Sequence, residues 1–430
     1  MMLKKILAKG LILGHSNTAR SLYWVFSGNA ILIVLTFFTT ILVANSLTKA
    51  ENGIFLALLT LANLLSDLGE AGLGSALSSF IPGLLIVPTT ENIKEARSIF
   101  ATAFKLELLI GAILGGMVIL LAKPLASWLF AGTATTHIQI TGFMVFILVL
   151  FGFMTFALSA YKKFREVSVV NIFYSFIRLF FIAFAVIFFK LSLFTALILY
   201  ALAFTLGWVY SLIFVKTDFL FEKNSPAHLK KLLHFSWFLA LQKMFISISS
   251  RLDLLMLVPL VGAVEASIYG IASRFSLVYP LIISSLGQVF APKFAEFAKG
   301  RDAVVFFKKT GFVIGMLLLS EVLFFIFASP LIRLLVPKYS EAVPVFQALL
   351  IAMTGFIIAT PFVSFLIYTV KKPYITTISS LIQLIVIFLA NLYFIPKMGR
   401  FGPVVGIGLG NAAACLLAVG ATWYYLKRET

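Results

Sequence analysis

Charged residues within long apolar stretches are the first candidates for chemistry in this sequence. The stretch ISSRLDLLMLVPL, residues 248–260, contains Arg251 and Asp253 two positions apart. A charge at the centre of a bilayer costs at least about 2.5–3.5 kcal/mol on insertion scales, so such a residue needs a partner, water or a ligand beside it. What these two residues can do therefore depends on the elements that hold them.

Those elements are long apolar segments. The chain has 430 residues, of which 61% are hydrophobic and only 12% are charged, whereas soluble domains carry about a quarter charged residues. A spanning helix needs about 20 mostly apolar residues. Twelve segments meet this requirement: 21–44, 53–81, 97–122, 138–160, 166–189, 192–215, 232–258, 264–290, 305–329, 342–369, 373–395 and 402–426. We predict an all-α polytopic membrane protein with twelve transmembrane helices.

The distribution of basic residues predicts how these helices enter the membrane. If the N-terminus is cytoplasmic, the inner connections carry 22 of the 34 Lys and Arg residues, the outer connections carry 7, and five lie within spans. Cytoplasmic loops carry an excess of Lys and Arg. We therefore expect a protein of the cytoplasmic membrane with both termini inside, and we attribute most of the net charge of +18 to topology. The segment 21–44 is longer than a signal-peptide core, so we expect it to be the first helix.

The two halves of the chain resemble each other. Three pairs of passages match in the same order: TKAENGIFLALL with GAVEASIYGIAS, KPLASWLF with SPLIRLLV, and YKKFREV with VKKPYIT. Six spans per half give both halves the same orientation, as in parallel repeats related by a pseudo-two-fold axis along the membrane normal. We predict six-helix lobes at 1–220 and 221–430 with a central cleft between them, where such proteins bind cargo.

Four basic residues within the spans are candidates for substrate binding. Arg274 lies about 11 residues into its predicted span, and its planar guanidinium suits a phosphate group. Arg251 is the second candidate. Lys243 is the third, although its long side chain can also extend to the interface. For Arg178, in SFIRLFF, pairing between helices is the alternative role.

Three acidic residues are candidates for ion coupling. On a continuous helix Asp253 lies about 200° from Arg251, so the two should not pair, and an ion pair of Asp253 with Arg274 or Lys243 is the alternative. Asp67 and Glu70 lie in LSDLGEAGLGSA, whose glycines can open the helix locally. Both acids are candidate proton or Na⁺ sites, with a buried ion pair on a glycine-rich packing face as the alternative. We assign structural roles to Lys105, Glu107 and Glu321.

Other motifs do not indicate a bound cofactor or metal. GPVVGIGLGNAA (402–413) has the glycine spacing of a close helix-packing face, and a nucleotide loop would need a soluble strand before it. The four histidines have no metal-ligand spacing, and the one cysteine, Cys415, cannot form an internal disulfide. We expect no cofactor apart from a coupling H⁺ or Na⁺.

Two passages carry a resemblance to a known family. They are LTKAENGIFLALLTLANLLSDLGEAGLGSALSSFIPG (47–83) and RLDLLMLVPLVGAVEASIYGIASRFSLVYPLIISSLGQVFAPKFAEFAKG (251–300). The sequence resembles the polysaccharide/oligosaccharide flippases, or polysaccharide biosynthesis proteins, of the multidrug/oligosaccharidyl-lipid/polysaccharide exporter superfamily. The resemblance implies two six-helix lobes, a central cationic cavity and alternating access for an undecaprenyl- or dolichyl-type carrier. The first span, NAILIVLTFFTTILVA, lacks the acid of drug-exporting relatives.

The functional hypothesis is therefore a flippase for a lipid-linked oligosaccharide. Its expected partners are that lipid, membrane lipids and glycosyltransferases or a polymerase of the same pathway, with no nucleic acid. An ion-coupled multidrug or metabolite exporter of the same superfamily is the main alternative, and undirected scrambling stays open. The loop PGLLIVPTTENIKEAR lacks the pattern of a major-facilitator transporter, and KPLASWLFAGTATTH lacks the carboxylates that a membrane enzyme would need.

Overall fold

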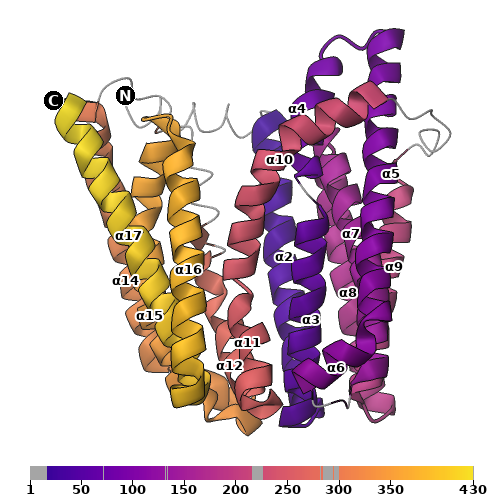
Figure 1. Ribbon diagram of the computed structural model, residues 1–430, viewed down its shortest axis with the longest axis vertical. Helices are drawn as coiled ribbons and strands as arrows, with labels where there is room; N and C mark the ends of the chain where they lie inside the picture. The colour runs from indigo at the N-terminus through magenta and orange to yellow at the C-terminus, as the bar shows by residue number, and fades with distance from the viewer. Residues whose placement is uncertain are drawn as a thin grey trace, which may run out of the picture. The chain divides into compact units, whose positions relative to one another are not determined.

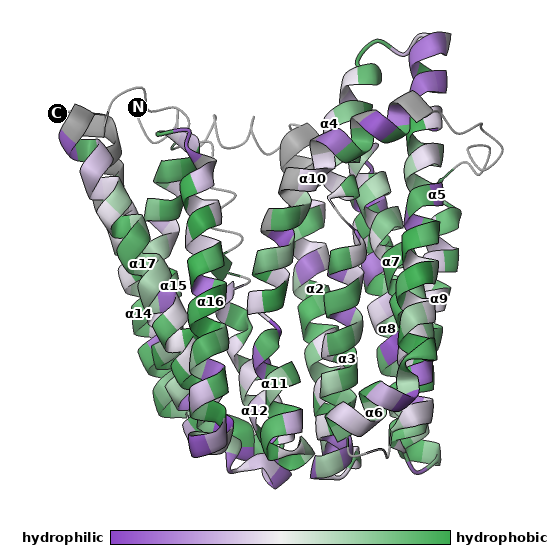
Figure 2. Cartoon of the chain, viewed as in Figure 1, coloured by the Kyte–Doolittle hydropathy of each residue, from purple (hydrophilic) through white to green (hydrophobic). Residues whose placement is uncertain are grey.

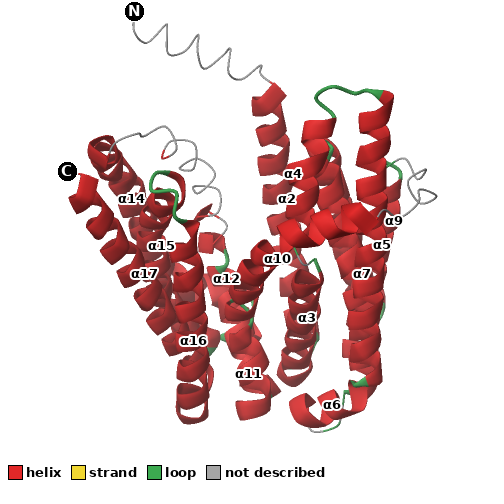
Figure 3. Cartoon of the chain, turned by 45° about the horizontal axis from the view of Figure 1, so that its top comes forward, coloured by secondary structure: helices red, strands yellow, loops and turns green. Residues whose placement is uncertain are grey.

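The computed structural model describes residues 17–70, 72–130, 132, 134–215, 226–280, 282–283, 294 and 300–429, and within these ranges it contains helices and no strands (Figure 3). The α-helices are α2 (Asn17–Ser46), α3 (Lys49–Gly69), α4 (Leu73–Leu84), α5 (Thr90–Leu120), α6 (Ala122–Phe130), α7 (Thr135–Ala160), α8 (Phe164–Phe188), α9 (Leu193–Leu212), α10 (Pro226–Ser249), α11 (Leu252–Val261), α12 (Ala263–Ser276), α14 (Gly300–Leu335), α15 (Ala342–Tyr368), α16 (Pro373–Met398) and α17 (Gly402–Glu429). Two short 3₁₀ turns, Pro337–Tyr339 and Gly399–Phe401, precede α15 and α17. The all-α prediction is confirmed.

Ten helical segments among the described residues are long and apolar enough to cross a membrane. One of them, Tyr374–Lys427, contains both α16 and α17, which correspond to two predicted spans. The eighth predicted span, 264–290, runs into residues outside the described ranges. The count of twelve therefore stays a prediction. Hydrophobic residues dominate the lengths of the helices, and hydrophilic residues gather at their ends (Figure 2).

The chain forms two compact units (Figure 1). The first contains α2 together with the described parts of Ala62–Ala126 and Ala134–Lys243. The second contains Leu47–Leu61, Ser127–Thr133 and the described residues from Met244 onward. These units differ from the sequence halves 1–220 and 221–430, because the first part of α3 belongs to the second unit and most of α10 belongs to the first.

The core of the first unit lies among α4, α5 and α7. Phe100 and Phe153 are 1% exposed, and their ring centroids lie 5.4 Å apart. Leu77 and Met154 are fully buried beside them. Because lipid tails are as apolar as these side chains, close packing rather than removal from water stabilises this cluster within a membrane.

In the second unit, the predicted glycine packing face of α17 is confirmed. A Cβ atom at Gly402 or Gly406 would overlap the backbone at Ile395 or the side chain of Asn391, both on α16. A Cβ at Gly410, one further turn along, would overlap the side chain of Ile387. The three glycines therefore allow α16 and α17 to approach closely.

One of the predicted repeats recurs as the same backbone turn in both units. Lys162 and Lys371, at matching positions of YKK and VKK, both have a φ of 58°. They are the two non-glycine residues with positive φ among the described residues. Each turn is followed by a lysine that donates a hydrogen bond to a distant part of its own unit, just beyond the end of α9 in the first unit and in α17 in the second. Lys163 donates to the Phe214 carbonyl at 2.7 Å, and Lys372 donates to the Tyr425 hydroxyl at 3.2 Å.

Candidate functional site

A helix break after α3 positions the first group of candidate residues. Gly72 has a φ of 72°, in the left-handed region, and separates α3 from α4. A Cβ at Gly72 would lie 2.8 Å from the Ser236 carbonyl oxygen and 3.2 Å from the Ala240 nitrogen, both on α10. Glycine is thus required here twice, by the backbone conformation and by the close approach of α10. The segment predicted as one span, 53–81, consists of α3 and most of α4, and the predicted opening of the helix at its glycines is confirmed.

Beside this break, Glu70 pairs with Lys243 of α10. The side chain of Glu70 is 9% exposed, whereas that of Lys243 is 37% exposed. Asp67, one turn earlier on α3, interacts electrostatically with the same ammonium group. The Lys243 Nζ also lies 4.9 Å from the ring centroid of Phe156, on α7. Two acids, one cation and one ring therefore meet within the first unit.

The sequence identified three of these four side chains as candidates but did not pair them. Phe156 was missed, because a phenylalanine in an apolar helix carries no signal of what it faces. Lys243 pairs with Glu70, which lies far from it in the sequence. A carboxylate is a group that can hold a proton, and a half-exposed ammonium is a group that can bind an anion. Among the described residues, no group of His, Cys, Asp and Glu side chains is arranged to hold a metal ion.

A second helix break positions Arg251 and Asp253. The continuous helix predicted over 232–258 is wrong, because α10 ends at Ser249 and α11 begins at Leu252. The hydroxyls of Ser249 and Ser250 bond back to the carbonyls of Phe245 and Ser247, at 2.8 and 3.0 Å. Side chains that compete for helical carbonyls in this way weaken and bend a helix. Arg251 lies in the turn between the two helices.

Asp253 is buried and satisfied by neutral donors. One of its oxygens accepts a hydrogen bond from the Leu254 backbone N–H at 2.7 Å, and the other accepts one from the Tyr269 hydroxyl on α12. The guanidinium of Arg251 also interacts electrostatically with this carboxylate. The expectation that Arg251 and Asp253 point apart rested on an unbroken helix. The sequence missed Tyr269 as a partner because only the fold brings it to Asp253.

The two remaining basic candidates differ in surroundings. Arg274 lies in the last turn of α12 and is half-buried. Arg178 on α8 is 4% exposed and donates to the hydroxyls of Tyr174 and Thr36, at 2.5 and 2.6 Å. Its guanidinium carbon lies 4.8 Å from the ring centroid of Tyr174 and 5.1 Å from that of Tyr200. These contacts with α2, α8 and α9 favour the alternative role, in which Arg178 pairs helices.

The other charged residues within the spans lie in different settings. Glu107 on α5 is fully buried, and neither of its carboxylate oxygens has a hydrogen-bond partner in the described part of the chain. Glu321 is 7% exposed and accepts a hydrogen bond from Thr354 at 3.1 Å. The structural role assigned to Glu321 agrees with this bond.

Beyond the ends of the spans, the second unit carries an ionic network. The ammonium of Lys49 lies 2.7 Å from Glu341, and the guanidinium of Arg400 lies 3.8 Å from the same carboxylate and 3.6 Å from Glu265. The hydrogen bond from Lys49 lowers the pKa of the Glu341 carboxyl, and the positive charges of Lys49 and Arg400 add to this effect. The network holds the first turn of α3 to the starts of α12 and α15.

Comparisons with known proteins agree with this architecture. A family model described as "Polysaccharide biosynthesis protein" matches residues 18–298. The lipid II flippase MurJ, in an inward closed conformation, has a similar fold with a TM-score of 0.75 and 16% identity over 92% of this chain and 87% of that chain. An inward-facing multidrug resistance MATE family transporter of the MOP superfamily gives a TM-score of 0.74 and 13% identity over 92% of this chain and 94% of its own. A MATE transporter from Vibrio cholerae gives 0.59 and 16% over 96% of both chains. No curated protein matches the sequence. These structures show a shared fold.

Proposed function

The chain belongs to the polysaccharide biosynthesis protein family, and from this premise we propose that it flips a polyprenyl-phosphate-linked oligosaccharide across the cytoplasmic membrane. It is a multi-pass membrane protein whose fold is that of flippases and transporters. The proteins that share this fold are transporters rather than enzymes. The similar structure of a lipid II flippase supports a lipid-linked cargo.

The observation that carries the proposal is the cluster of Asp67, Glu70 and Lys243 at the α3–α4 break. Burying an ion pair within an apolar helical unit costs free energy, so we take the presence of this pair as a sign of function. The diphosphate of the carrier lipid is an anion that competes with Glu70 for the half-exposed ammonium of Lys243. Loss of that partner would leave the buried Glu70 carboxylate uncompensated, and it would then take up a proton.

The proposed mechanism follows from this competition. Arrival of the diphosphate at Lys243 is linked to protonation of Glu70, and its departure on the other side is linked to release of that proton. Asp67 stabilises the ammonium in both arrangements. In the second unit, Arg251 and Arg274 are further basic candidates for contact with the cargo. The polyprenyl tail stays in lipid, and no covalent bond is made or broken.

The surrounding proposals concern orientation and partners. We place both termini in the cytoplasm, because the excess of Lys and Arg lies in the connections on that side. The cargo then reaches the protein from glycosyltransferases on the inner face and leaves it toward a polymerase on the outer face.

The experiment is a flipping assay with the purified protein in liposomes. A short fluorescent oligosaccharide on a polyprenyl diphosphate is placed in both leaflets, and a membrane-impermeant quencher reports how much becomes accessible from outside. We expect time-dependent flipping whose rate falls more than about tenfold in Lys243→Gln. This corresponds to a transport barrier at least about 1.4 kcal/mol higher. Lys94→Gln, which removes an exposed cation from α5, is the matched control and should keep normal flipping.

The alternative is an ion-coupled exporter, which the similar MATE structures favour. The same liposomes, loaded with a fluorescent organic cation and given a pH gradient, test it directly. Cation efflux without lipid flipping would replace our proposal with the exporter. Lipid flipping that Lys243→Gln leaves at the normal rate would retain the flippase but reject the role of the cluster.

A further inference from the structure

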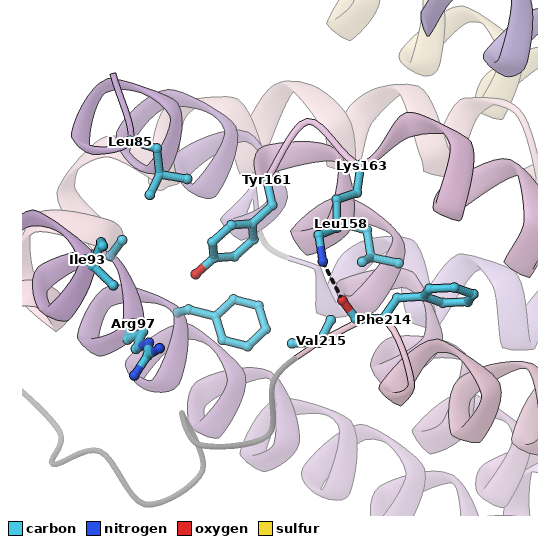
Figure 4. Close-up of a pocket in the computed structure, with 10 residues that line it drawn as sticks. Leu85, Ile93, Arg97, Leu158, Tyr161, Lys163, Phe214 and Val215 are labelled. Atoms are coloured by element: carbon cyan, nitrogen blue, oxygen red, sulfur yellow. Dashed lines mark hydrogen bonds between the residues drawn. The ribbon is translucent and has the colours of Figure 1, made fainter. Parts of the chain in front are cut away.

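A cavity lies at one end of the first unit, apart from the cluster at the α3–α4 break. It has a volume of about 350 Å³, near the lower limit for small-molecule sites. Five helix ends form it, namely the C-terminal ends of α4, α7 and α9 and the N-terminal ends of α5 and α8 (Figure 4). By the distribution of Lys and Arg, this is the end of the helices that we place at the cytoplasmic face.

The lining of this cavity combines apolar walls with two cations. Leu85, Ile93, Leu158 and Val215 are among its apolar side chains. The polar lining consists of Arg97 from α5, Tyr161 from the end of α7 and Lys163 at the start of α8, and Figure 4 shows all three side chains. Among the described residues, no acidic side chain is part of the lining. An amphiphile with an anionic head matches this combination.

The hydrogen-bond donors of these three residues can serve an anion. The ammonium of Lys163 donates to the Phe214 carbonyl, which fixes its position and leaves further N–H donors available. Arg97 is half-buried and carries five N–H donors in a planar group suited to phosphate oxygens. Burial raises the pKa of the Tyr161 phenol, and the charge of Arg97 opposes this shift, so at neutral pH the hydroxyl keeps its proton and can donate it.

We propose that this cavity binds the phosphate head of an anionic phospholipid of the surrounding membrane, with Arg97 and Tyr161 on the phosphate and Lys163 at the rim. The acyl chains pass over the apolar wall toward the lipid. The matching turn of the second unit provides a comparison for Lys163. There the ammonium of Lys372 lies 4.7 Å from the ring centroid of Tyr425 and donates to the Tyr425 hydroxyl. The corresponding lysine is thus engaged by an aromatic side chain, whereas Lys163 bonds to the backbone and lines a cavity.

The test measures lipids that remain bound to the purified full-length protein by native mass spectrometry. Phosphatidylglycerol and phosphatidylcholine are titrated separately, and Arg97→Gln is compared with Lys94→Gln, which lies one turn away on α5 and is exposed. We expect a clear preference for phosphatidylglycerol. Its affinity should fall about fivefold in Arg97→Gln, because one basic residue near an anionic lipid contributes about 1 kcal/mol. It should fall less than twofold in Lys94→Gln. Leu158→Trp, which fills the cavity, should weaken binding as strongly as Arg97→Gln.

Three results would overturn the proposal. Equal losses in Arg97→Gln and Lys94→Gln would mean general attraction to a basic surface. Full displacement of phosphatidylglycerol by glycerol phosphate would mean that the site takes a free phosphate and not a lipid. Displacement by an equimolar polyprenyl phosphate would assign the site to the cargo. The flipping assay is run on the same variants. If the wild type flips the cargo but Arg97→Gln binds phosphatidylglycerol as well as the wild type does, this inference fails while the proposed function stands.

Discussion

Glu70 and Asp253 both lie next to helix breaks within apolar helices, yet their partners differ in kind. Glu70 pairs with the ammonium of Lys243, which is 37% exposed. Asp253, as buried as Glu70, is held by a backbone N–H and by the hydroxyl of Tyr269, which is fully buried. The first arrangement has a partly exposed charge, whereas the second is closed within side-chain and backbone contacts.

This difference separates an exchangeable pair from a structural one. In the proposed function, an anionic ligand replaces Glu70 at Lys243, because both compete for the same positive charge. We propose no such exchange for Asp253, because its hydrogen bonds come from a buried hydroxyl and a backbone N–H and Arg251 adds only electrostatic attraction. We therefore expect changes at Glu70 and Lys243 to alter transport, and changes at Asp253 and Tyr269 to alter stability.

The largest effect is expected from reversing the charges of the exchangeable pair. Lys243→Glu places a third acid beside Asp67 and Glu70, so the protein should lose about 3–5 kcal/mol of stability and all transport. The double variant Glu70→Lys with Lys243→Glu restores an opposite-charge pair. It should recover most of the thermal stability but not the transport, because the cation now sits at the buried position on the other helix.

The measurements are the melting temperature in detergent and the flipping rate of the same preparations. Recovery of both quantities in the double variant would show that the pair acts only as a structural contact. Loss of both would show that the local packing cannot accept the exchange, and Glu70→Gln, which keeps the shape of the side chain, then decides whether the carboxylate is required for transport.

A smaller effect is expected from the closed pair. Tyr269→Phe removes the hydroxyl and leaves one oxygen of the buried Asp253 without its donor, which should cost about 1–3 kcal/mol of stability. Flipping per folded molecule should stay near normal. Tyr279→Phe is the matched control. Tyr279 is as deeply buried as Tyr269, but its hydroxyl has the neutral Ser320 hydroxyl as partner, at 3.3 Å, so its loss should cost less. A strong fall in flipping at unchanged stability in Tyr269→Phe would reverse the assignment of the two pairs.

The helix break itself is the next target. Gly72→Ala forces an alanine into the left-handed region, at about 1–2 kcal/mol, and brings a Cβ to 2.8 Å from the Ser236 carbonyl oxygen. Stability should fall, and flipping should fall with it because Glu70 and Lys243 are displaced. Gly116→Ala on α5 is the control, since nothing lies within 4 Å of its Cβ position. It should be neutral or stabilising by up to about 1 kcal/mol through helix propensity.

The comparison also shows which features can be predicted from a sequence. The apolar segments and the glycine-rich opening near Asp67 and Glu70 were predictable, because length, hydropathy and glycine spacing are local properties. Tyr269 could not be identified as the partner of Asp253, since that contact depends on how α11 and α12 pack. The break at Ser249–Arg251 was missed because two serines in an apolar run give no strong local signal until their carbonyl partners are known.

The same limit applies to the basic residues. Lys243, Arg178, Arg251 and Arg274 look alike in the sequence, as cations in apolar spans. The structure separates Arg178, enclosed by two tyrosine rings and two hydroxyls, from Lys243, which keeps more than a third of its side chain exposed. Burial and partners, rather than residue type, therefore decide which of these charges a ligand can reach.

The smallest change in stability is expected from Glu341, an acid outside the spans. Lys49 and Arg400 lower the pKa of the Glu341 carboxyl in the folded protein. The ionised carboxylate therefore stabilises the fold fully above the unfolded pKa of about 4.3. This stabilisation is lost as the pH falls through the lower folded pKa. Because Glu341 is 47% exposed, this contribution should stay below about 1 kcal/mol and shrink in high salt. Glu341→Gln should therefore lower the melting temperature slightly at pH 7, and by less as the pH falls below about 4. An equal difference between variant and wild type across this pH range would mean that packing, and not charge, holds the start of α15 to α3.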